Sequence, residues 1–353
     1  MRWPARPLSC RGAACAGRTA LPPQAFQHVK TMSSCKIAFT SCARYQPHVP
    51  QVAWDDVLRA DPDYLLLLGD QIYMDFGLWP FAREYQGRPK RYSVAQFEAV
   101  MRRKYEQQWA EPHFARLLAH MRAKGGLLGV WDDHDFAWNN AYGADTTLPP
   151  EAAMPEKRAV ARALFHEFMA CAPQPPDLFG AVDTPLARII LLDNRWDATP
   201  LKQPDPVLMG ARQMDFLAGA LQHDKPYTLI CAGLTLTRSA ENWSKYRREF
   251  ARFQQLVQGR PGVLYLGGDI HKNAFDAPVA DGLPPCYQIV SSGVCVNILG
   301  LPFEWDRRRN WTLLALQPEE VQVAQHDKHG VTRWRIARET WSHQALGRSA
   351  RVV

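Results

Sequence analysis

Short apolar runs alternate with longer amphipathic stretches through the first three quarters of the chain. The apolar runs have the length and residue types of buried strands. They cover residues 36–40, 64–68, 127–131, 187–192, 227–232 and 263–266. The stretches between them have helical spacing, which predicts helices over 52–60, 94–122, 156–169, 212–221 and 245–257. This alternation is typical of the α/β fold class.

The pattern changes after residue 269, where apolar runs continue without helical stretches between them. These runs predict strands over 287–291, 311–316, 321–326 and 332–337. They favour a second, more antiparallel sheet in addition to the first. Two mixed β-sheets with helices outside them would form a four-layer αββα sandwich.

Composition and charge exclude several classes of protein. Hydrophobic residues make up 46% and charged residues 22% of the 353 positions, as in globular proteins. No apolar run approaches the roughly 20 residues of a membrane-spanning helix. The net charge is +7, but residues 1–34 contain five Lys and Arg and no acid, so the remaining chain is nearly neutral. We therefore expect no nucleic-acid partner and no transmembrane segment.

The basic N-terminal segment lacks the features of an export signal. It has neither an apolar stretch of about 7–15 residues nor an Arg-Arg pair. We expect residues 1–34 to be a disordered basic extension, or a leader that precedes a true start at Met32. An organelle presequence is the alternative. The folded domain is expected over residues 35–345, in the cytoplasm and with reduced cysteines.

Polar side chains with metal-binding chemistry follow four of the predicted strands. Cys42 follows the first strand, Asp70 follows the second, Asp133 follows the third, and Asp269 and His271 follow a later one. Reactive crevices of open α/β sheets lie beyond the carboxyl ends of the strands, so these side chains are expected to meet. A cluster so rich in carboxylates is costly without a cation. The sequence therefore predicts a metal centre.

Phosphoryl transfer is the chemistry that needs such a centre. Two metals about 3.5–4 Å apart activate a water and bind the phosphate oxygens, which requires one bridging carboxylate. Asp70 is the candidate bridge, because Gly69 before it permits close approach of the backbone. The chain contains no Gly-x-Ser-x-Gly elbow, P-loop or Gly-x-Gly-x-x-Gly motif, which disfavours a serine hydrolase.

These motifs also resemble those of known families. Gly69-Asp70-x-x-Tyr73 is similar to the motif of purple acid phosphatases, where the tyrosine binds iron. The full set resembles the alkaline phosphatase D (PhoD-like) family over roughly residues 36–300; it comprises Ser41-Cys42, Trp131-Asp132-Asp133-His134, Asp193-x-Arg195 and Gly268-Asp269-x-His271. The resemblance implies the αββα metallophosphoesterase sandwich for residues 35–345.

The resemblance also implies the ligands and the metals. Ferric iron would be held by Cys42, Asp70, Tyr73 and His271, and a second, harder cation by Asp70, Asp133 and Asp269. Calcium is the usual second metal of the family, and manganese or magnesium are alternatives, since cytoplasmic free calcium is scarce. Thiolate, phenolate and imidazole suit iron, and a carboxylate site suits calcium.

Four further residues are expected to act on the substrate. His134 is interpreted as a proton donor to the leaving oxygen. Arg195 is expected to clamp the phosphate through its forked guanidinium. Asn139 and Asn140 are the remaining substrate-binding candidates.

We expect a phosphoesterase that hydrolyses small phosphomonoesters, phosphodiesters or both, with a metal-bound hydroxide as the nucleophile. One alternative is a nuclease or cyclic-nucleotide phosphodiesterase on the same scaffold, whose loop aromatics would stack on bases. Another is a metal-binding sensor or scaffold without catalysis. The complete ligand set disfavours this last alternative, because a degenerate member would be expected to lack a ligand.

Overall fold

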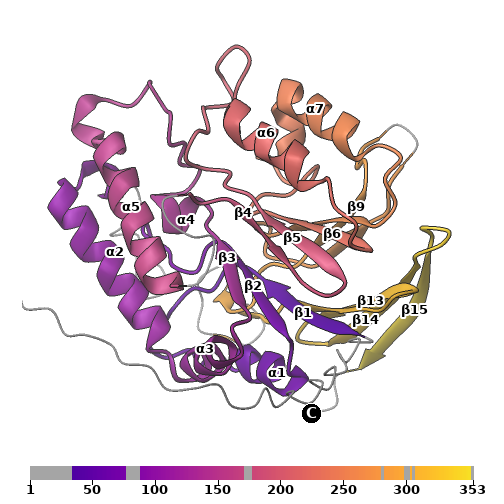
Figure 1. The fold of residues 1–353 in the computed structure, drawn as a ribbon. Helices are drawn as coiled ribbons and strands as arrows, with labels where there is room; N and C mark the ends of the chain where they lie inside the picture. The colour runs from indigo at the N-terminus through magenta and orange to yellow at the C-terminus, as the bar shows by residue number, and fades with distance from the viewer. Residues whose placement is uncertain are drawn as a thin grey trace, which may run out of the picture. The chain divides into compact units, whose positions relative to one another are not determined.

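Two mixed β-sheets lie face to face in the computed structural model, with helices outside each of them (Figure 1). The structure describes residues 34–76, 88–170, 177–279, 282–297, 303 and 307–350. The predicted extension lies outside the described residues, except for Ser34.

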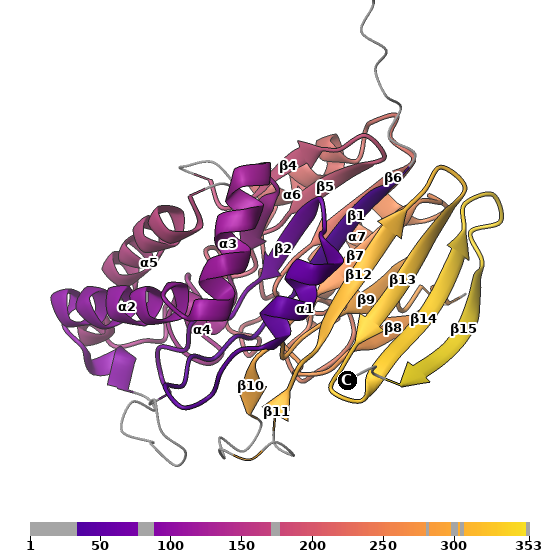
Figure 2. The same ribbon diagram turned by 90° about the horizontal axis from the view of Figure 1, so that it is seen from below.

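The first sheet contains the first three strands and the last four strands of the chain. Its order is β15-β14-β13-β12-β1-β2-β3, with β1, β2 and β3 parallel and the other neighbours antiparallel. The strands are β1 (Cys35–Thr40), β2 (Tyr64–Leu68), β3 (Leu127–Val130), β12 (Trp311–Leu316), β13 (Glu320–His326), β14 (Gly330–Ala337) and β15 (His343–Ala350). Figure 2 shows β12 to β15 extending this sheet beyond β1.

The second sheet has the order β4-β5-β6-β7-β9-β8, with antiparallel strands at both edges and parallel strands between them. Its strands are β4 (Gly180–Asp183), β5 (Ala187–Leu191), β6 (Tyr227–Cys231), β7 (Val263–Gly267), β8 (Ala274–Asp276) and β9 (Tyr287–Val290). A separate two-stranded ladder pairs β10 (Val296–Asn297) with β11 (Arg307–Arg308).

The helices divide between the outer faces of the two sheets. The first sheet is covered by α1 (Ala53–Ala60), α2 (Val94–Trp109), α3 (Pro112–Lys124) and α5 (Met154–Met169). The second is covered by α6 (Gly210–Ala220) and α7 (Arg247–Val257). A single turn, α4 (Asp133–Phe136), follows β3. Single 3₁₀ turns are η1 (Arg88–Arg91), η2 (Pro150–Ala152) and η3 (Trp243–Lys245).

The main core lies between the two sheets. Phe39 of β1 and Leu66 of β2 are fully buried there, together with Leu229, Leu264 and Ile289 from the second sheet. Alternate residues of the same strands, such as Leu65 and Leu67 of β2, contact the helices instead. Since both faces of the central strands are buried, those strands are continuous apolar runs. The predicted four-layer αββα sandwich is confirmed.

Two expectations about the elements were wrong. The helix predicted over residues 94–122 is two helices, because Pro112 cannot continue a helix and instead begins α3, where the Glu111 side chain accepts a hydrogen bond from the Phe114 amide (2.8 Å). The C-terminal strands also do not form a sheet of their own. Instead β12 pairs with β1 in antiparallel register, with Phe39 opposite Thr312.

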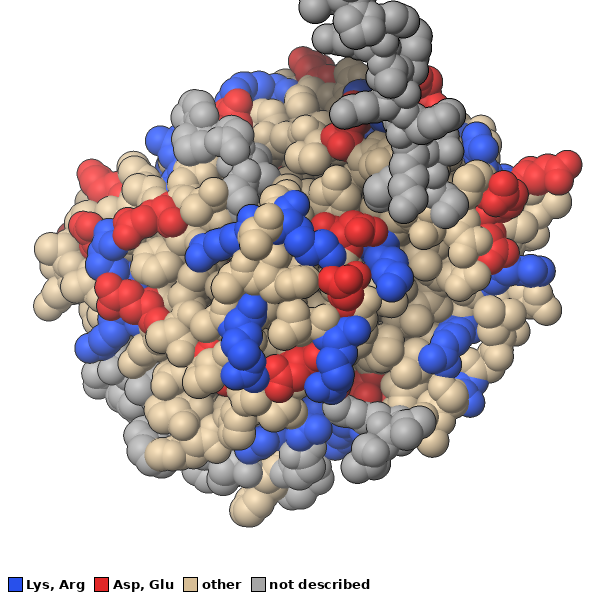
Figure 3. Space-filling model, turned by 60° about the horizontal axis from the view of Figure 1, so that its bottom comes forward, with Lys and Arg blue, Asp and Glu red and all other residues tan. Residues whose placement is uncertain are grey.

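In the part of the chain that the structure describes, no helix has both the length and the apolar character needed to cross a bilayer. On the face shown in Figure 3, Lys and Arg side chains are interspersed with Asp and Glu side chains. Pairs between exposed cations and acids include Lys124–Asp61 (2.8 Å) and Arg348–Asp327 (2.7 Å).

Candidate metal centre

The loops after β1 and β2 are joined where both strands end. The Cys42 amide donates to the Gly69 carbonyl (3.1 Å), and the Ala43 amide donates to the Asp70 carbonyl (2.8 Å). The loop after β7 approaches from the second sheet, where the Gly268 amide donates to the Gly233 carbonyl. A Cβ on Gly268 would lie 2.6 Å from Ser41 Oγ, so the two sheets meet closely here. The expected convergence of strand ends is therefore present.

Four of the predicted ligands have left-handed backbone conformations. Their φ angles are +62° at Cys42, +56° at Asp70, +70° at Asp269 and +53° at His271. Such φ angles in non-glycine residues cost of order 1–3 kcal/mol each and persist where the surroundings enforce them, most often at functional sites. The backbone therefore holds these side chains in directions that ordinary turns would not give them.

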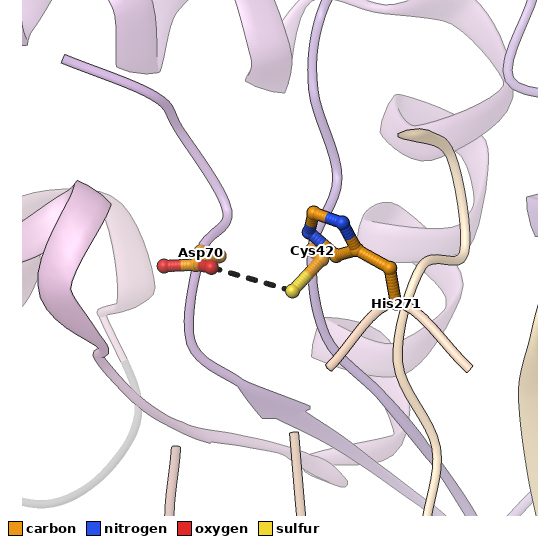
Figure 4. A group of neighbouring side chains, drawn as sticks. All are labelled: Cys42, Asp70 and His271. Atoms are coloured by element: carbon orange, nitrogen blue, oxygen red, sulfur yellow. Dashed lines mark hydrogen bonds between the residues drawn. The ribbon is translucent and has the colours of Figure 1, made fainter. Parts of the chain in front are cut away.

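Cys42, Asp70 and His271 form the first group of potential metal ligands (Figure 4). Their ligand atoms all lie within 4.8 Å of one another, and Cys42 Sγ is 3.3 Å from Asp70 Oδ2. The Tyr73 hydroxyl joins the group, 3.2 Å from His271 Nε2 and 3.5 Å from Asp70 Oδ2. Ser292 also donates to the Cys42 sulfur (3.2 Å). The side chains expected to bind iron are therefore adjacent.

Asp70, Asp133 and His134 form the second group, with ligand atoms also within 4.8 Å of one another. The Oδ1 atom of Asp70 accepts a hydrogen bond from the His134 amide (3.3 Å), while its Oδ2 faces Cys42. Asp70 thus belongs to both groups, as a bridging ligand must. Asp133 Oδ2 accepts from the Asn140 amide (2.5 Å), and Asp133 Oδ1 is buried without a hydrogen-bond partner among the described residues.

Burial disfavours the charged form of each side chain in the first group, so it raises the pKa values of the acids and lowers that of the histidine. It raises the pKa of the Cys42 thiol to about 12 and, with the neighbouring Cys42, holds the pKa of Asp70 well above its usual range. It lowers the pKa of His271 to about 4, helped by the charges of His134 and Arg308. His271 is therefore a neutral imidazole, whereas thiolate and carboxylate need a cation beside them.

His134 has an acidic partner that sequence reasoning missed. Its Nδ1 lies 2.7 Å from Asp75 Oδ1, and both side chains are almost completely buried. Burial alone would lower the pKa of His134, but Asp133, Asp75 and Asp70 raise it well above the usual value. The other carboxylate oxygen of Asp75 accepts from the Asn139 amide (3.0 Å). The ring orientation of His134 is therefore fixed, with Nε2 as its remaining polar atom.

Asp269 differs from the other predicted ligands. Its carboxylate belongs to neither ligand group in the described residues. Burial and the negative charge of Asp133 raise its pKa to about 6, so the two carboxyl groups are close enough to repel each other. Asp269 therefore stays a predicted ligand of the second metal.

Arg195 has a different environment from the phosphate clamp expected. Its side chain is 1% exposed, and its Nε and Nη1 donate to Asp132 (2.7 Å) and Glu241 (3.0 Å). Burial alone would lower its pKa, but these two carboxylates raise the pKa well above the ordinary value. The sequence showed that Arg195 follows a strand, but not that Asp132 and Glu241 would occupy its donors. Its guanidinium therefore joins the loop before α4 to the loop after β6, and its predicted role as a phosphate clamp stays a prediction.

Asn139 and Asn140 are exposed residues that follow α4, next to the second group. Their amides bind Asp75 and Asp133, as described above, so their backbones position these carboxylates. Asp75 was detectable in principle, because it comes two residues after the Tyr73 motif. Glu241 had no local signal, since it lies in a loop far from the strand-end motifs in sequence.

The chain is similar to known proteins in sequence family and in fold. The family model described as PhoD-like phosphatase matches residues 37–345. A solved structure described as PhoD aligns with a TM-score of 0.64 and 16% sequence identity, covering 91% of this chain and 72% of that one. The TT1561 protein of Thermus thermophilus aligns with a TM-score of 0.37 and 8% identity, covering 89% and 98%. A comparison with curated protein sequences finds no match.

Proposed function

We propose that this chain, which belongs to the PhoD-like phosphatase family and is therefore a hydrolase acting on phosphate esters, hydrolyses small phosphate esters. The proposed site is formed by the two groups of potential metal ligands that share Asp70. The observation that supports this most strongly is the double role of Asp70, whose carboxylate belongs to both groups of potential metal ligands. Phosphoryl-transfer centres with two metals need such a shared carboxylate.

The donor set supports two different metals. Cys42, Asp70, Tyr73 and His271 would hold ferric iron, because thiolate, phenolate and imidazole suit that ion. Asp70 and Asp133, with Asp269 beside them, would hold a harder divalent cation, calcium or else manganese or magnesium. The unpartnered, buried Asp133 Oδ1 has a lone pair available for such an ion. When bound, the metals would acidify a water to serve as the nucleophile and would neutralise charge on the phosphate oxygens.

The protein's own residues contribute positioning and proton transfer. Asp75 orients His134 through Nδ1, so that Nε2 can donate a proton to the leaving oxygen of the ester. Arg195 holds two loops beside these residues together, because it pairs with Asp132 before α4 and with Glu241 after β6. Asn139 and Asn140, exposed next to Asp133, are proposed to contact the substrate.

The charges on the face shown in Figure 3 give no support to a nucleic-acid substrate. A polyanion requires clustered Lys and Arg on one face. The face in Figure 3 instead mixes both signs of charge, and the five cations of residues 1–34 account for most of the net charge.

The proposal is tested by replacing the shared carboxylate. Asp70→Asn should lose both hydrolysis of mono- and bis-aryl phosphates and stoichiometric metal, measured by inductively coupled plasma spectrometry. Asp215→Asn is the matched control, because it makes the same chemical change at an exposed residue. Asp215 lies on α6 and pairs with Arg252. Wild-type turnover in Asp70→Asn would rule out the proposed centre.

A further inference from the structure

Three consecutive arginines lie in and directly after the second strand of the small ladder. Arg307 and Arg308 form β11, in which Arg308 pairs with Val296 and Arg307 pairs with Asn297. Successive residues of a strand point to opposite faces. Arg308 is therefore directed to one side of the ladder, and Arg307 and Arg309 to the other.

Backbone hydrogen bonds fix this ladder to the loop that carries Cys42. Ala43 forms a parallel bridge with Cys295, and the Arg44 amide donates to the Cys295 carbonyl (3.0 Å). The Gly293 amide donates to the Ser41 carbonyl (3.0 Å). The strand that carries Arg308 is thus attached to the same segment as the predicted iron ligand.

The segment after Arg308 is also fixed to the loop that carries His271. Asn310 donates through Nδ2 to the carbonyls of His271 (3.3 Å) and Ser292 (2.7 Å). A Cβ placed on Gly293 would lie 3.1 Å from Arg308 Cβ and 3.2 Å from His271 Cα. Gly293, with φ +89°, therefore allows Arg308 to lie next to His271.

The positive charges of the three arginines influence different neighbouring groups. Arg309 and Arg307 favour the thiolate form of Cys295 and so oppose the rise in its pKa caused by burial. The charge of Arg308 acts on His271 instead, in the direction that lowers its pKa. This division matches the alternation expected from the strand.

Arg308 also differs from Arg195 in its partners. Arg195 is fully buried and paired with two carboxylates. Arg308 is half-buried, and in the described part of the chain it has no hydrogen bond and no ion pair. Its guanidinium donors are therefore available to an anion at the His271 side of the centre.

We propose that Arg308 binds the phosphoryl oxygens of the substrate, since the donors of Arg195 already contact Asp132 and Glu241. This inference rests on the proposed function, since it assigns a phosphate-binding residue to the same site. A guanidinium presents paired donors that match two oxygens of one phosphate. Because a monoester carries more negative charge than a diester, Arg308 favours monoesters in binding.

The test measures equilibrium binding of inorganic phosphate as well as turnover. Isothermal titration calorimetry is performed on the metal-loaded wild type, Arg308→Met, Arg308→Lys and Arg103→Met. Arg103 is an exposed residue of α2, so its variant has the same change in net charge away from the site. Metal content is measured in every sample, and kcat and KM are measured for a mono-aryl and a bis-aryl phosphate.

We expect Arg308→Met to weaken phosphate binding by about 10- to 100-fold, as for the loss of a charge-assisted hydrogen bond. Its kcat/KM should fall more for the monoester than for the diester. Arg308→Lys should fall between Arg308→Met and the wild type, while Arg103→Met should match the wild type. All variants should retain metal.

If Arg308→Met binds phosphate with the affinity of the wild type, the inference is overturned, whatever the activity of the variants. Loss of metal from both Arg308 variants would also overturn it, because Arg308 would then act on metal retention. A metal-loaded wild type that hydrolyses neither ester would instead refute the proposed function, whatever its affinity for phosphate.

Discussion

Replacing Arg195 with methionine separates a structural role for this residue from a role in binding substrate. The Arg195 and Asp132 side chains are each 1% exposed, and Glu241 is 9% exposed. Arg195→Met keeps most of the side-chain volume but leaves two buried carboxylates without their cation. Asp132 also caps α4, so the effect should extend to the turn that carries Asp133 and His134.

The expected cost is that of breaking a buried ion pair by removing one partner. Such changes destabilise proteins by about 3–5 kcal/mol, because the remaining charge stays buried and unpaired. For a domain of this size we expect the melting temperature to fall by about 6–10 °C. Guanidinium chloride unfolding, followed by tryptophan fluorescence in one metal-containing buffer, measures the change in the free energy of unfolding.

A double variant tests the cause of the loss. Adding Glu241→Gln to Arg195→Met removes one of the two unpaired charges and should restore part of the stability. Glu241→Gln alone should cost less than Arg195→Met, since Asp132 still pairs with Arg195. The reasoning would be refuted if Arg195→Met unfolded like the wild type and only raised KM, which is the result expected of a phosphate clamp.

Three further predictions concern single positions. Asp75→Asn should slow hydrolysis of alkyl phosphates, whose leaving oxygen needs a proton, more than that of nitrophenyl phosphates; an equal loss for both would contradict proton donation by His134. Gly69→Ala should destabilise the fold by more than about 1 kcal/mol and lower metal content, because Gly69 has φ +84° and an added Cβ would lie 2.4 Å from Asp132 Cβ. Burial raises the pKa of Asp327, but hydrogen bonds from Arg348 and backbone amides outweigh it and hold the pKa below its usual value. This carboxylate therefore stabilises the fold fully above the unfolded pKa of about 3.9, and the stability difference between wild type and Asp327→Asn should be lost as the pH falls from that value through the lower pKa of the folded state.

The apolar runs sufficed to predict most strands, because buried strands in this sandwich are apolar on both faces. Leu65 to Leu68 are all fully buried, with alternate residues in different cores. The same criterion misses β15, whose eight residues are all exposed and which pairs only with β14. β15 is a strand because it pairs with β14, and no local pattern in residues 343–350 predicts that pairing.

Local motifs also identified most of the side chains in the two groups of potential metal ligands, because these side chains come directly after strands. Cys42, Asp70 and His271 were found in this way, and the fold brings them together. The partners of Arg195 and the position of Arg308 depend on contacts distant in sequence. Glu241 and Arg308 lie in segments without a strand-end motif, so their roles emerge only once the chain is folded.

Reconstitution of metal-free protein tests the central claim most directly. Chelator-treated protein is restored with iron together with calcium, manganese or magnesium, and hydrolysis of a bis-aryl phosphate and the matching mono-aryl phosphate is followed. We expect no turnover without metal, and turnover of at least one ester when iron and one divalent cation are both present. Equal turnover before and after metal removal, or none with either ester despite stoichiometric iron, would contradict a metal-dependent phosphoesterase.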